Sequence, residues 1–119
     1  MNERILAESE QYRIEAEYES VLLTVKESGR TVCIGDFYGD PAGALLDADG
    51  RFAVLYGCGV IVYFLHHPYA PYQYDTLHPQ WFERYRMDPM RRITGAEQTD
   101  DHTVFLLFET GEPETLHIP

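Results

Sequence analysis

Short apolar runs separated by tight turns are the feature of this sequence that most restricts its fold. The clearest case is residues 43–57, GALLDADGRFAVLYG, where Asp49-Gly50 lies between two apolar runs. Asp-Gly is typical of the two-residue turn of a β-hairpin, because both residues tolerate positive φ angles. Residues 12–18, YRIEAEY, alternate with the period of a half-buried strand, although Glu and Ala also favour a helix here. The apolar face of that strand comprises Tyr12, Ile14, Ala16 and Tyr18.

The rest of the chain predicts further strands and one long loop. Residues 58–65, CGVIVYFL, are apolar on both faces, which is typical of a central strand covered on both sides. Residues 66–79 contain three prolines and three tyrosines without a clear period, so we expect a long loop. Residues 79–87, PQWFERYRM, are interpreted as a short helix, because Pro79 suits a first helical position and Pro89 would stop the helix. Further strands are expected at residues 20–26, 31–37, 90–98, 102–109 and 114–119.

These signals predict a mainly β fold, an antiparallel β-sandwich or open barrel of about eight strands with one short helix. The length of 119 residues suits a single domain spanning residues 1–119. Cys33 and Cys58 fall in predicted apolar strands, so we expect reduced, buried thiols, with a disulfide between them as the alternative.

The charge balance limits the kinds of partner that the chain can bind. The formal net charge is −11, which repels phosphate backbones and disfavours a nucleic-acid role. The same charge suits a basic protein partner, or solubility alone. The N-terminus is charged from residue 3, and the longest apolar run, residues 60–65, is far shorter than the roughly 20 residues of a membrane helix. We therefore expect a soluble, cytoplasmic protein that does not bind membranes.

The segment GDFYGDP, residues 35–41, is the strongest candidate for a site. Asp36 and Asp40 could act as an acid and a base or hold a cation, but calcium loops supply more oxygen ligands at regular spacing. Asp and Gly before Pro also form turns, because Asp bonds its own backbone and Gly accepts a positive φ angle. We interpret the segment as a structural turn whose acidic tip, with Tyr38, is open to a partner. Metal binding and catalysis are the alternatives.

Other patterns in the sequence do not favour an enzyme. His66 and His67 are adjacent, so on a strand they point to opposite faces and rarely hold one ion. No serine lies in a G-x-S-x-G elbow, and no glycine-rich segment has the lysine and spacing of a P-loop. We therefore predict no catalytic residue, no metal, no cofactor and no enzymatic activity.

Acidic and aromatic side chains instead predict a contact surface. The solvent face of the strand at residues 12–18 carries Glu15 and Glu17, continued by Glu19, which could steer a basic partner or form an ordinary solvated face. Tyrosines of the 66–79 loop could anchor that partner, because tyrosine is enriched in interaction hot spots. The predicted partner-binding residues are Glu15, Glu17, Glu19, Asp36, Tyr38, Asp40, Tyr69, Tyr72 and Tyr74.

Two segments also resemble a known class of proteins. Residues 31–65, TVCIGDFYGDPAGALLDADGRFAVLYGCGVIVYFL, and residues 81–86, WFERYR, resemble the small, acidic immunity proteins of bacterial contact-dependent and polymorphic toxin systems. The resemblance implies that the protein binds a cognate toxin, often a nuclease, and blocks it, but it assigns no contact residues. The toxin would be basic, and its substrate site would be occluded or its nucleic acid held off by carboxylates. The alternatives are a small-ligand binding module that uses the tyrosine-rich loop and a sheet face, and a small hydrolase that uses Asp36, Asp40 and a histidine.

Overall fold

The computed structural model describes residues 3–87 and 89–119, and all regular structure in this part of the chain is β-strand. The mainly β fold is confirmed, and no helix long and apolar enough to span a membrane occurs in the described residues. The strands are β1 (Glu3–Glu8), β2 (Tyr12–Glu17), β3 (Ser20–Val25), β4 (Arg30–Asp36), β5 (Gly43–Leu46), β6 (Phe52–Gly57), β7 (Gly59–Phe64), β8 (Trp81–Arg84), β9 (Ile93–Asp100), β10 (Thr103–Phe108) and β11 (Pro113–His117).

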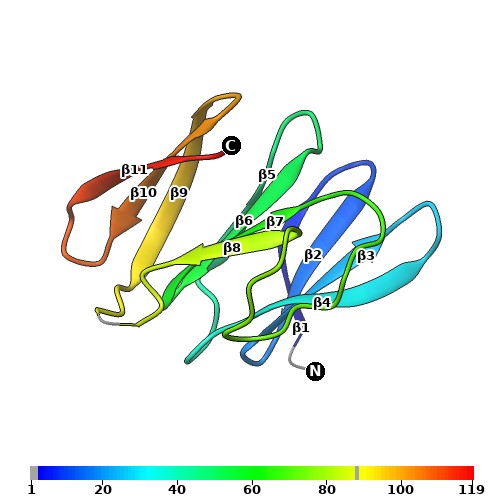
Figure 1. Cartoon of the computed structure of the whole chain (residues 1–119), viewed down its shortest axis with the longest axis horizontal. Coiled ribbons are helices and arrows are strands. Elements are labelled where there is room, and N and C mark those ends of the chain that lie inside the picture. The colour runs from blue at the N-terminus through cyan, green and yellow to red at the C-terminus, as the bar shows by residue number, and fades with distance from the viewer. Residues whose placement is uncertain (1–2, 88) are drawn as a thin grey trace.

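The strands form three antiparallel sheets. The first sheet has the order β1-β2-β3-β4, the middle sheet has the order β5-β6-β7-β8, and the third has the order β11-β10-β9. Figure 1 shows the three sheets side by side, with the middle sheet between the other two. The chain completes each sheet before it starts the next, which explains why its strand signals come at short, regular intervals.

Alternation along β6 and β7 divides the core into two clusters. Successive side chains of a strand point to opposite faces, and both faces of these two strands are buried. One core cluster joins the middle sheet to the first, with Ala53, Leu55, Ile61 and Tyr63 among its members. The other joins the middle sheet to the third, with Phe52, Val54, Val60 and Val62 among its members. The prediction of a central strand at residues 58–65 is confirmed, because β7 has a strand on each side and core on each face.

The short helix predicted at residues 79–87 is wrong, since this segment contains β8. The strand pairs with β7 from Tyr63 opposite Trp81 to Val60 opposite Arg84. This pairing buries the Trp81 ring, which stacks on the Tyr63 ring at a centroid distance of 6.3 Å. The long-range pairing outweighs the local helix signals, and a φ angle of 60° at Tyr85 then interrupts the strand.

The first sheet contains one strand that the sequence pattern does not predict, and one residue beside it lies in a different position from the predicted one. β1 lies in the charged N-terminal segment, where it pairs with β2 and lies against β5. β2 confirms the strand interpretation of residues 12–17 over the helix. Tyr18, expected on the buried face of that strand, lies instead in the two-residue turn Tyr18-Glu19 between β2 and β3, and it is exposed.

The 66–79 loop has no regular secondary structure, as expected, and it packs onto the first and middle sheets. Gln80 is buried at its end, where the side chain accepts a hydrogen bond from the N–H of Ala70 (2.9 Å) and donates to two main-chain carbonyls at 2.8 and 2.6 Å. The N–H of Tyr72 donates to the carbonyl of Cys33 (2.9 Å), so the loop also covers the edge of β4.

Cys33 and Cys58 are free, but both are only half-buried, so the prediction that they are buried is wrong. Cys33 lies on the outer face of β4, since the alternation of the strand turns its neighbours Val32 and Ile34 into the core. Burial raises the pKa of the Cys33 thiol. Cys58 lies in the turn between β6 and β7 and forms a β-bridge with Arg92.

Candidate protein-interaction surface

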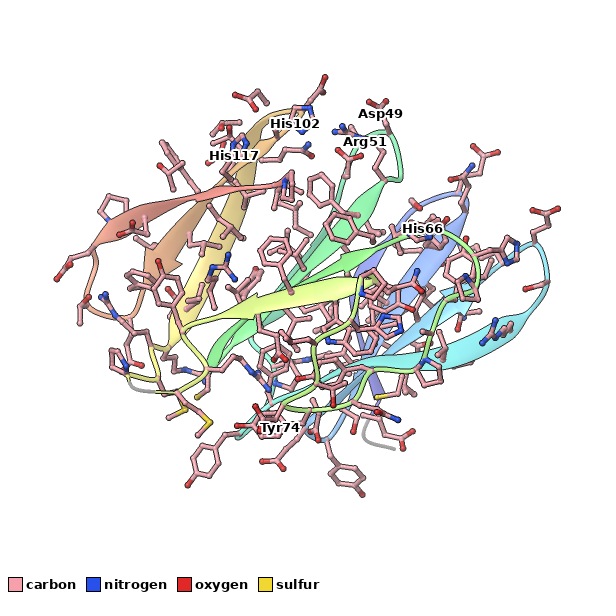
Figure 2. The ribbon with its side chains drawn as sticks, viewed as in Figure 1. Asp49, Arg51, His66, Tyr74, His102 and His117 are labelled. Atoms are coloured by element: carbon pink, nitrogen blue, oxygen red, sulfur yellow. The ribbon has the colours of Figure 1, made fainter. Side chains whose placement is uncertain are left out.

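Exposed aromatic and methionine side chains gather at one end of the molecule. Of the nine exposed large apolar side chains in the described residues, this end holds Tyr18, Tyr38, Tyr74, Met87 and Met90. Three carboxylate side chains lie beside them, from Glu19, Asp36 and Asp40. These eight residues are named the aromatic-acidic end, whose position is given by the label of Tyr74 in Figure 2.

Three connections between strands build the aromatic-acidic end. They are the turn between β2 and β3, the 37–42 connection between β4 and β5, and the segment between β8 and β9. Glu19 joins the first two, because its Oε2 accepts a hydrogen bond from the N–H of Gly39 (2.6 Å) and its carbonyl accepts one from another N–H of the same connection (2.9 Å). The Tyr74 hydroxyl reaches the third, where it donates to the sulfur of Met87 (2.7 Å).

Arg86 holds these connections together from inside. Its side chain is 11% exposed, and its guanidinium lies 4.6 Å from the centre of the Phe37 ring and 5.7 Å from that of Tyr74. The guanidinium donates hydrogen bonds to the carbonyl of Asp36 and to a carbonyl of the β6–β7 turn. Its Nε lies 3.0 Å from Glu83 Oε1, as an ion pair without the alignment of a hydrogen bond. Arg86 is therefore a structural cation.

The carboxylates of Asp36 and Asp40 are exposed, and they make no ion pair within residues 3–87 and 89–119. Two arginines lie close by, but both bond main-chain oxygens: Arg4 donates to the carbonyl of Pro41, and Arg86 to that of Asp36. The negative charge of the two aspartates therefore faces solvent beside exposed apolar surface. That combination suits a partner that brings its own cations.

Two pockets open at the aromatic-acidic end. One of about 300 Å³ is lined mainly by Glu19, Asp36, Tyr38, Tyr74, Arg86 and Met90. The other, of about 180 Å³, is lined by Arg4, Ala16, Tyr18 and Asp40. Asp36 and Asp40 thus line different pockets without a histidine, and no three His, Cys, Asp or Glu side chains of the described chain are grouped to hold a metal ion. The arrangement suits contact with another molecule better than it suits acid-base chemistry.

The predicted contact residues separate into two groups on the surface. Five of them meet at the aromatic-acidic end: Glu19, Asp36, Tyr38, Asp40 and Tyr74. Glu15 and Glu17 lie on the outer face of β2, opposite in direction to the buried residues of that strand. Glu19 turns away from them toward the 37–42 connection, so the three glutamates do not form one strip.

Tyr69 and Tyr72 belong to the core, so their prediction as surface anchors is wrong. The Tyr69 hydroxyl lies 2.9 Å from the Tyr12 hydroxyl, and the Tyr72 hydroxyl donates to Glu83 Oε1 (2.7 Å). Burial is the main cause that raises the pKa of Tyr72, and the hydrogen bond to Glu83 adds to it. The loop folds back over the sheets, and of its three tyrosines only Tyr74 remains exposed.

Three residues of the aromatic-acidic end are not among the predicted ones. Tyr18 continues the alternation of the preceding strand, so the pattern places it on that strand. The only sign of a turn is that two polar residues separate Tyr18 from the next apolar run. Met87 ends the predicted helix and Met90 begins the next predicted strand, and neither position gives a signal that its side chain is exposed.

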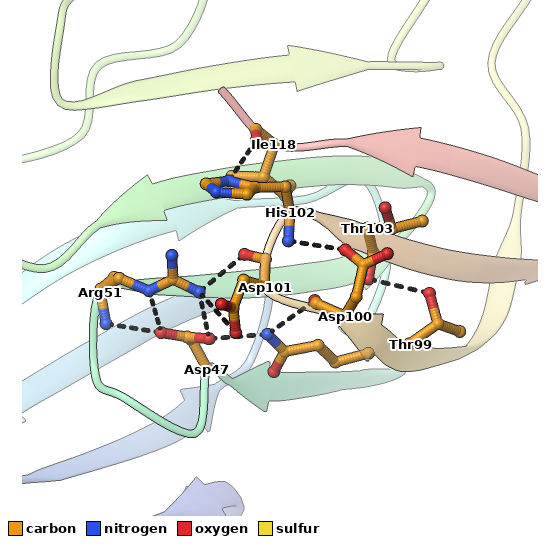
Figure 3. A network of polar contacts seen from close by, with 9 residues as sticks. Asp47, Arg51, Thr99, Asp100, Asp101, His102, Thr103 and Ile118 are labelled. Atoms are coloured by element: carbon orange, nitrogen blue, oxygen red, sulfur yellow. Dashed lines mark hydrogen bonds and ion pairs between the residues drawn. The ribbon is translucent and has the colours of Figure 1, made fainter.

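The opposite end carries a buried carboxylate that is satisfied within the chain. Asp47 accepts hydrogen bonds from Arg51 Nε (2.8 Å), Nη2 (3.0 Å) and main-chain N–H (3.0 Å), and from Gln98 Nε2 (2.7 Å). Arg51 also donates to the carbonyl of Asp101 (2.6 Å), as Figure 3 shows. Burial raises the pKa of Asp47, but the hydrogen bonds outweigh it and hold the pKa well below its usual range. The network ties the β5–β6 hairpin to the third sheet.

A larger pocket, of about 590 Å³, lies between the 75–79 segment and β8. The His78 ring stacks on the Trp81 ring at a centroid distance of 4.4 Å, and Leu77 is fully exposed at its edge. Tyr69 and Tyr72 do not line this pocket, although the Tyr72 ring lies 5.3 Å from the ring of Trp81, which does.

Comparisons with known proteins gave no match to a protein-family model, to a curated protein or to a solved structure. What this chain binds must therefore be inferred from its own side chains.

Proposed function

We propose that this protein binds a basic protein partner through the aromatic-acidic end, and that the partner is the cognate toxin of a bacterial toxin–immunity pair. One observation carries the proposal: five exposed aromatic and methionine side chains share one end with aspartates that make no ion pair with any described residue. Tyrosine is enriched in interaction hot spots, and methionine adapts to the shape of a partner. The resemblance of residues 31–65 and 81–86 to immunity proteins names the kind of partner.

The two kinds of side chain would act at different stages of binding. Exposed carboxylates attract a basic partner over a distance and raise the association rate. Tyr38 and Tyr74 would then lose their water and pack against the partner, which slows dissociation. If the partner is a nuclease, its basic substrate site is the surface that fits this end, so binding would block the substrate directly.

Binding and inhibition by the purified protein test this proposal. The immunity role requires that the adjacent gene encode a large secreted protein with a basic C-terminal domain, and that domain is the probe. We expect one-to-one binding in surface plasmon resonance, an association rate that falls as salt is raised, and loss of the domain's toxic activity in the complex. Absence of binding to this domain would contradict the immunity role, and salt-independent association would contradict the role of the carboxylates.

A second candidate function is the binding of a small ligand in the pocket beside β8. The stacked His78 and Trp81 rings and the volume of about 590 Å³ favour it, because ligand sites are concave and largely apolar with a few polar groups. A small molecule bound there would raise the melting temperature of the isolated protein. The His78→Ala variant should lose that rise, whereas Tyr38→Ala should keep it.

A further inference from the structure

β10 has the sequence pattern of a strand that is covered on both faces. Residues 104–108, VFLLF, are all apolar, which is typical of strands with both faces buried. β6 and β7 have a similar pattern, and both of their faces are packed in the core. β10 is packed on one face only, through Val104, Leu106 and Phe108. Its pattern therefore indicates a further layer, which the described chain does not supply.

The uncovered face of the third sheet is centred on Phe105 and Leu107, which are 48% and 47% exposed. Four residues of β9 and β11 share this face, because residues opposite one another in a sheet point to the same side. They are Gly95, Glu97, Pro113 and Thr115. These six residues are named the outer face of the third sheet. Figure 1 shows no described strand beyond this sheet, on its side away from the middle sheet.

The charge on this face indicates what can cover it. The outward residues of β2, in the first sheet, are the charged Arg13, Glu15 and Glu17, which remain hydrated without a cover. The outer face of the third sheet has one carboxylate, Glu97, in a chain with 20 acidic residues. A basic partner finds little charge to attract it there. A second copy of this acidic chain meets little local repulsion at the same face.

We propose that two copies of the chain pack against each other through the outer faces of their third sheets. This inference goes beyond the proposed function. Thr115, Phe105 and Glu97 form one row across the sheet. A two-fold axis that lies between the two sheets and runs parallel to β10 places the Phe105 rings of the two copies together. It also places Glu97 over Thr115 of the second copy, where the hydroxyl can donate to the carboxylate, and keeps the two Glu97 side chains apart.

The size of the face limits the strength of the dimer. Three strands with about five residues each cover roughly 14 Å by 17 Å, whereas a stable interface buries about 800 Å² per partner. We therefore expect a weak dimer, with a Kd of about 100 µM. Salt screens the repulsion between two chains of net charge −11, so the dimer should become stronger as salt is raised. Binding of the proposed toxin domain should change with salt in the opposite direction.

Sedimentation equilibrium of the purified protein, from roughly 10 µM to about 1 mM, tests the inference. We expect the mean mass to rise from one chain toward two. Phe105→Thr combined with Leu107→Thr should weaken the dimer at least about tenfold, while circular dichroism shows an intact fold, because Thr suits an exposed strand position. The matched control is Ile5→Thr, which removes an exposed apolar side chain from a strand of the first sheet and should leave the dimer unchanged.

A charge variant tests the axis and leaves every apolar side chain in place. Thr115→Lys puts a cation over Glu97 of the second copy, so the dimer should become about threefold tighter than that of Gln73→Lys. Gln73→Lys makes the same change of charge in the exposed part of the 66–79 loop.

The outcomes concern the dimer alone. A mass of one chain at every concentration would overturn the inference, and so would a dimer that the double threonine variant leaves unchanged. A dimer that weakens with salt would contradict the argument from charge, and equal affinities for Thr115→Lys and Gln73→Lys would contradict the axis. The result does not depend on the toxin, because no residue of this face belongs to the aromatic-acidic end.

Discussion

At one end of the molecule Asp47 is buried among the donors of Arg51 and Gln98, whereas at the other end Asp36 and Asp40 face solvent without an ion pair within the described chain. Figure 2 places the two regions far apart, with Arg51 at the top and Tyr74 at the bottom. The first arrangement joins two sheets, and the second leaves charge beside exposed aromatic rings.

The difference between the ends indicates that a net charge of −11 does not by itself reveal which carboxylates are available to a partner. Each of these carboxylates adds one negative charge to it, yet only the carboxylates that lack a cation can act on a partner. The position of the arginines decides which carboxylates these are, since Arg51 pairs with Asp47 while Arg86 donates to the main-chain carbonyl of Asp36.

The largest expected effect concerns the stability of the fold. Asp47→Ala removes the acceptor of four hydrogen bonds from Arg51 and Gln98, and we expect it to lower the free energy of unfolding by about 3 kcal/mol. Asp40→Ala, at the other end, should change it by less than about 0.5 kcal/mol. Urea denaturation measures both, and equal losses for the two variants would erase the contrast between the ends.

Acid should weaken the same network in a defined direction. The pKa of Asp47 is lowered in the folded state, so its stabilising effect is complete above the unfolded pKa of about 3.9 and is lost as the pH falls below it. Near neutral pH we expect the wild type to exceed Asp47→Asn by about 2 kcal/mol in the free energy of unfolding. The gap between them should narrow below about pH 4. A gap that stays constant in acid would mean that Asp47 acts without its charge.

Removal of an aromatic ring should affect binding and leave the fold intact. Tyr38→Ala deletes the most exposed tyrosine of the aromatic-acidic end, and we expect about tenfold weaker binding of the toxin domain, or about 1.4 kcal/mol. The matched control is Phe105→Ala, because Phe105 is also an exposed aromatic residue but lies on β10. Equal losses of affinity for the two variants would show that exposed aromatic surface anywhere supports binding.

The smallest expected effect is on the rate of association. Asp36→Asn combined with Asp40→Asn removes two exposed charges while the side chains keep their size, so association should slow by about threefold and depend less on salt. Dissociation should change little, because exposed charges at an interface act mainly on the encounter. Stopped-flow association at low and high salt measures the difference. A faster dissociation with an unchanged association rate would mean that these carboxylates make close contacts instead.

Local patterns predict most of the strands, and long-range pairing decides the exceptions. Alternation at residues 12–17 and the Asp49-Gly50 turn act over a few residues, so the strands beside them could be predicted. The spacing of Trp81 and Tyr85 is compatible with a helix, but pairing with β7 makes this segment a strand. No local signal contains that information.

The candidate site likewise contains residues whose exposure local patterns predict and residues whose burial depends on long-range packing. Asp36, Tyr38 and Asp40 could be predicted as exposed, because the turn that carries them is determined by its own Gly and Pro residues. Tyr69 and Tyr72 could not be distinguished from Tyr74 in the sequence. Their burial depends on how the loop is held against the sheets by Gln80 and by the edge of β4, which is a property of the folded chain.

Hydrogen–deuterium exchange of the protein with and without the toxin domain tests most directly that the aromatic-acidic end binds the partner. We expect the domain to protect the main-chain amides of residues 18–19 and 37–40 and of the segment between β8 and β9. The β5–β6 turn and the β9–β10 turn at the opposite end should exchange at the same rate in both states. Protection confined to those two turns, or to the segment around His78, would contradict the assignment of the binding surface.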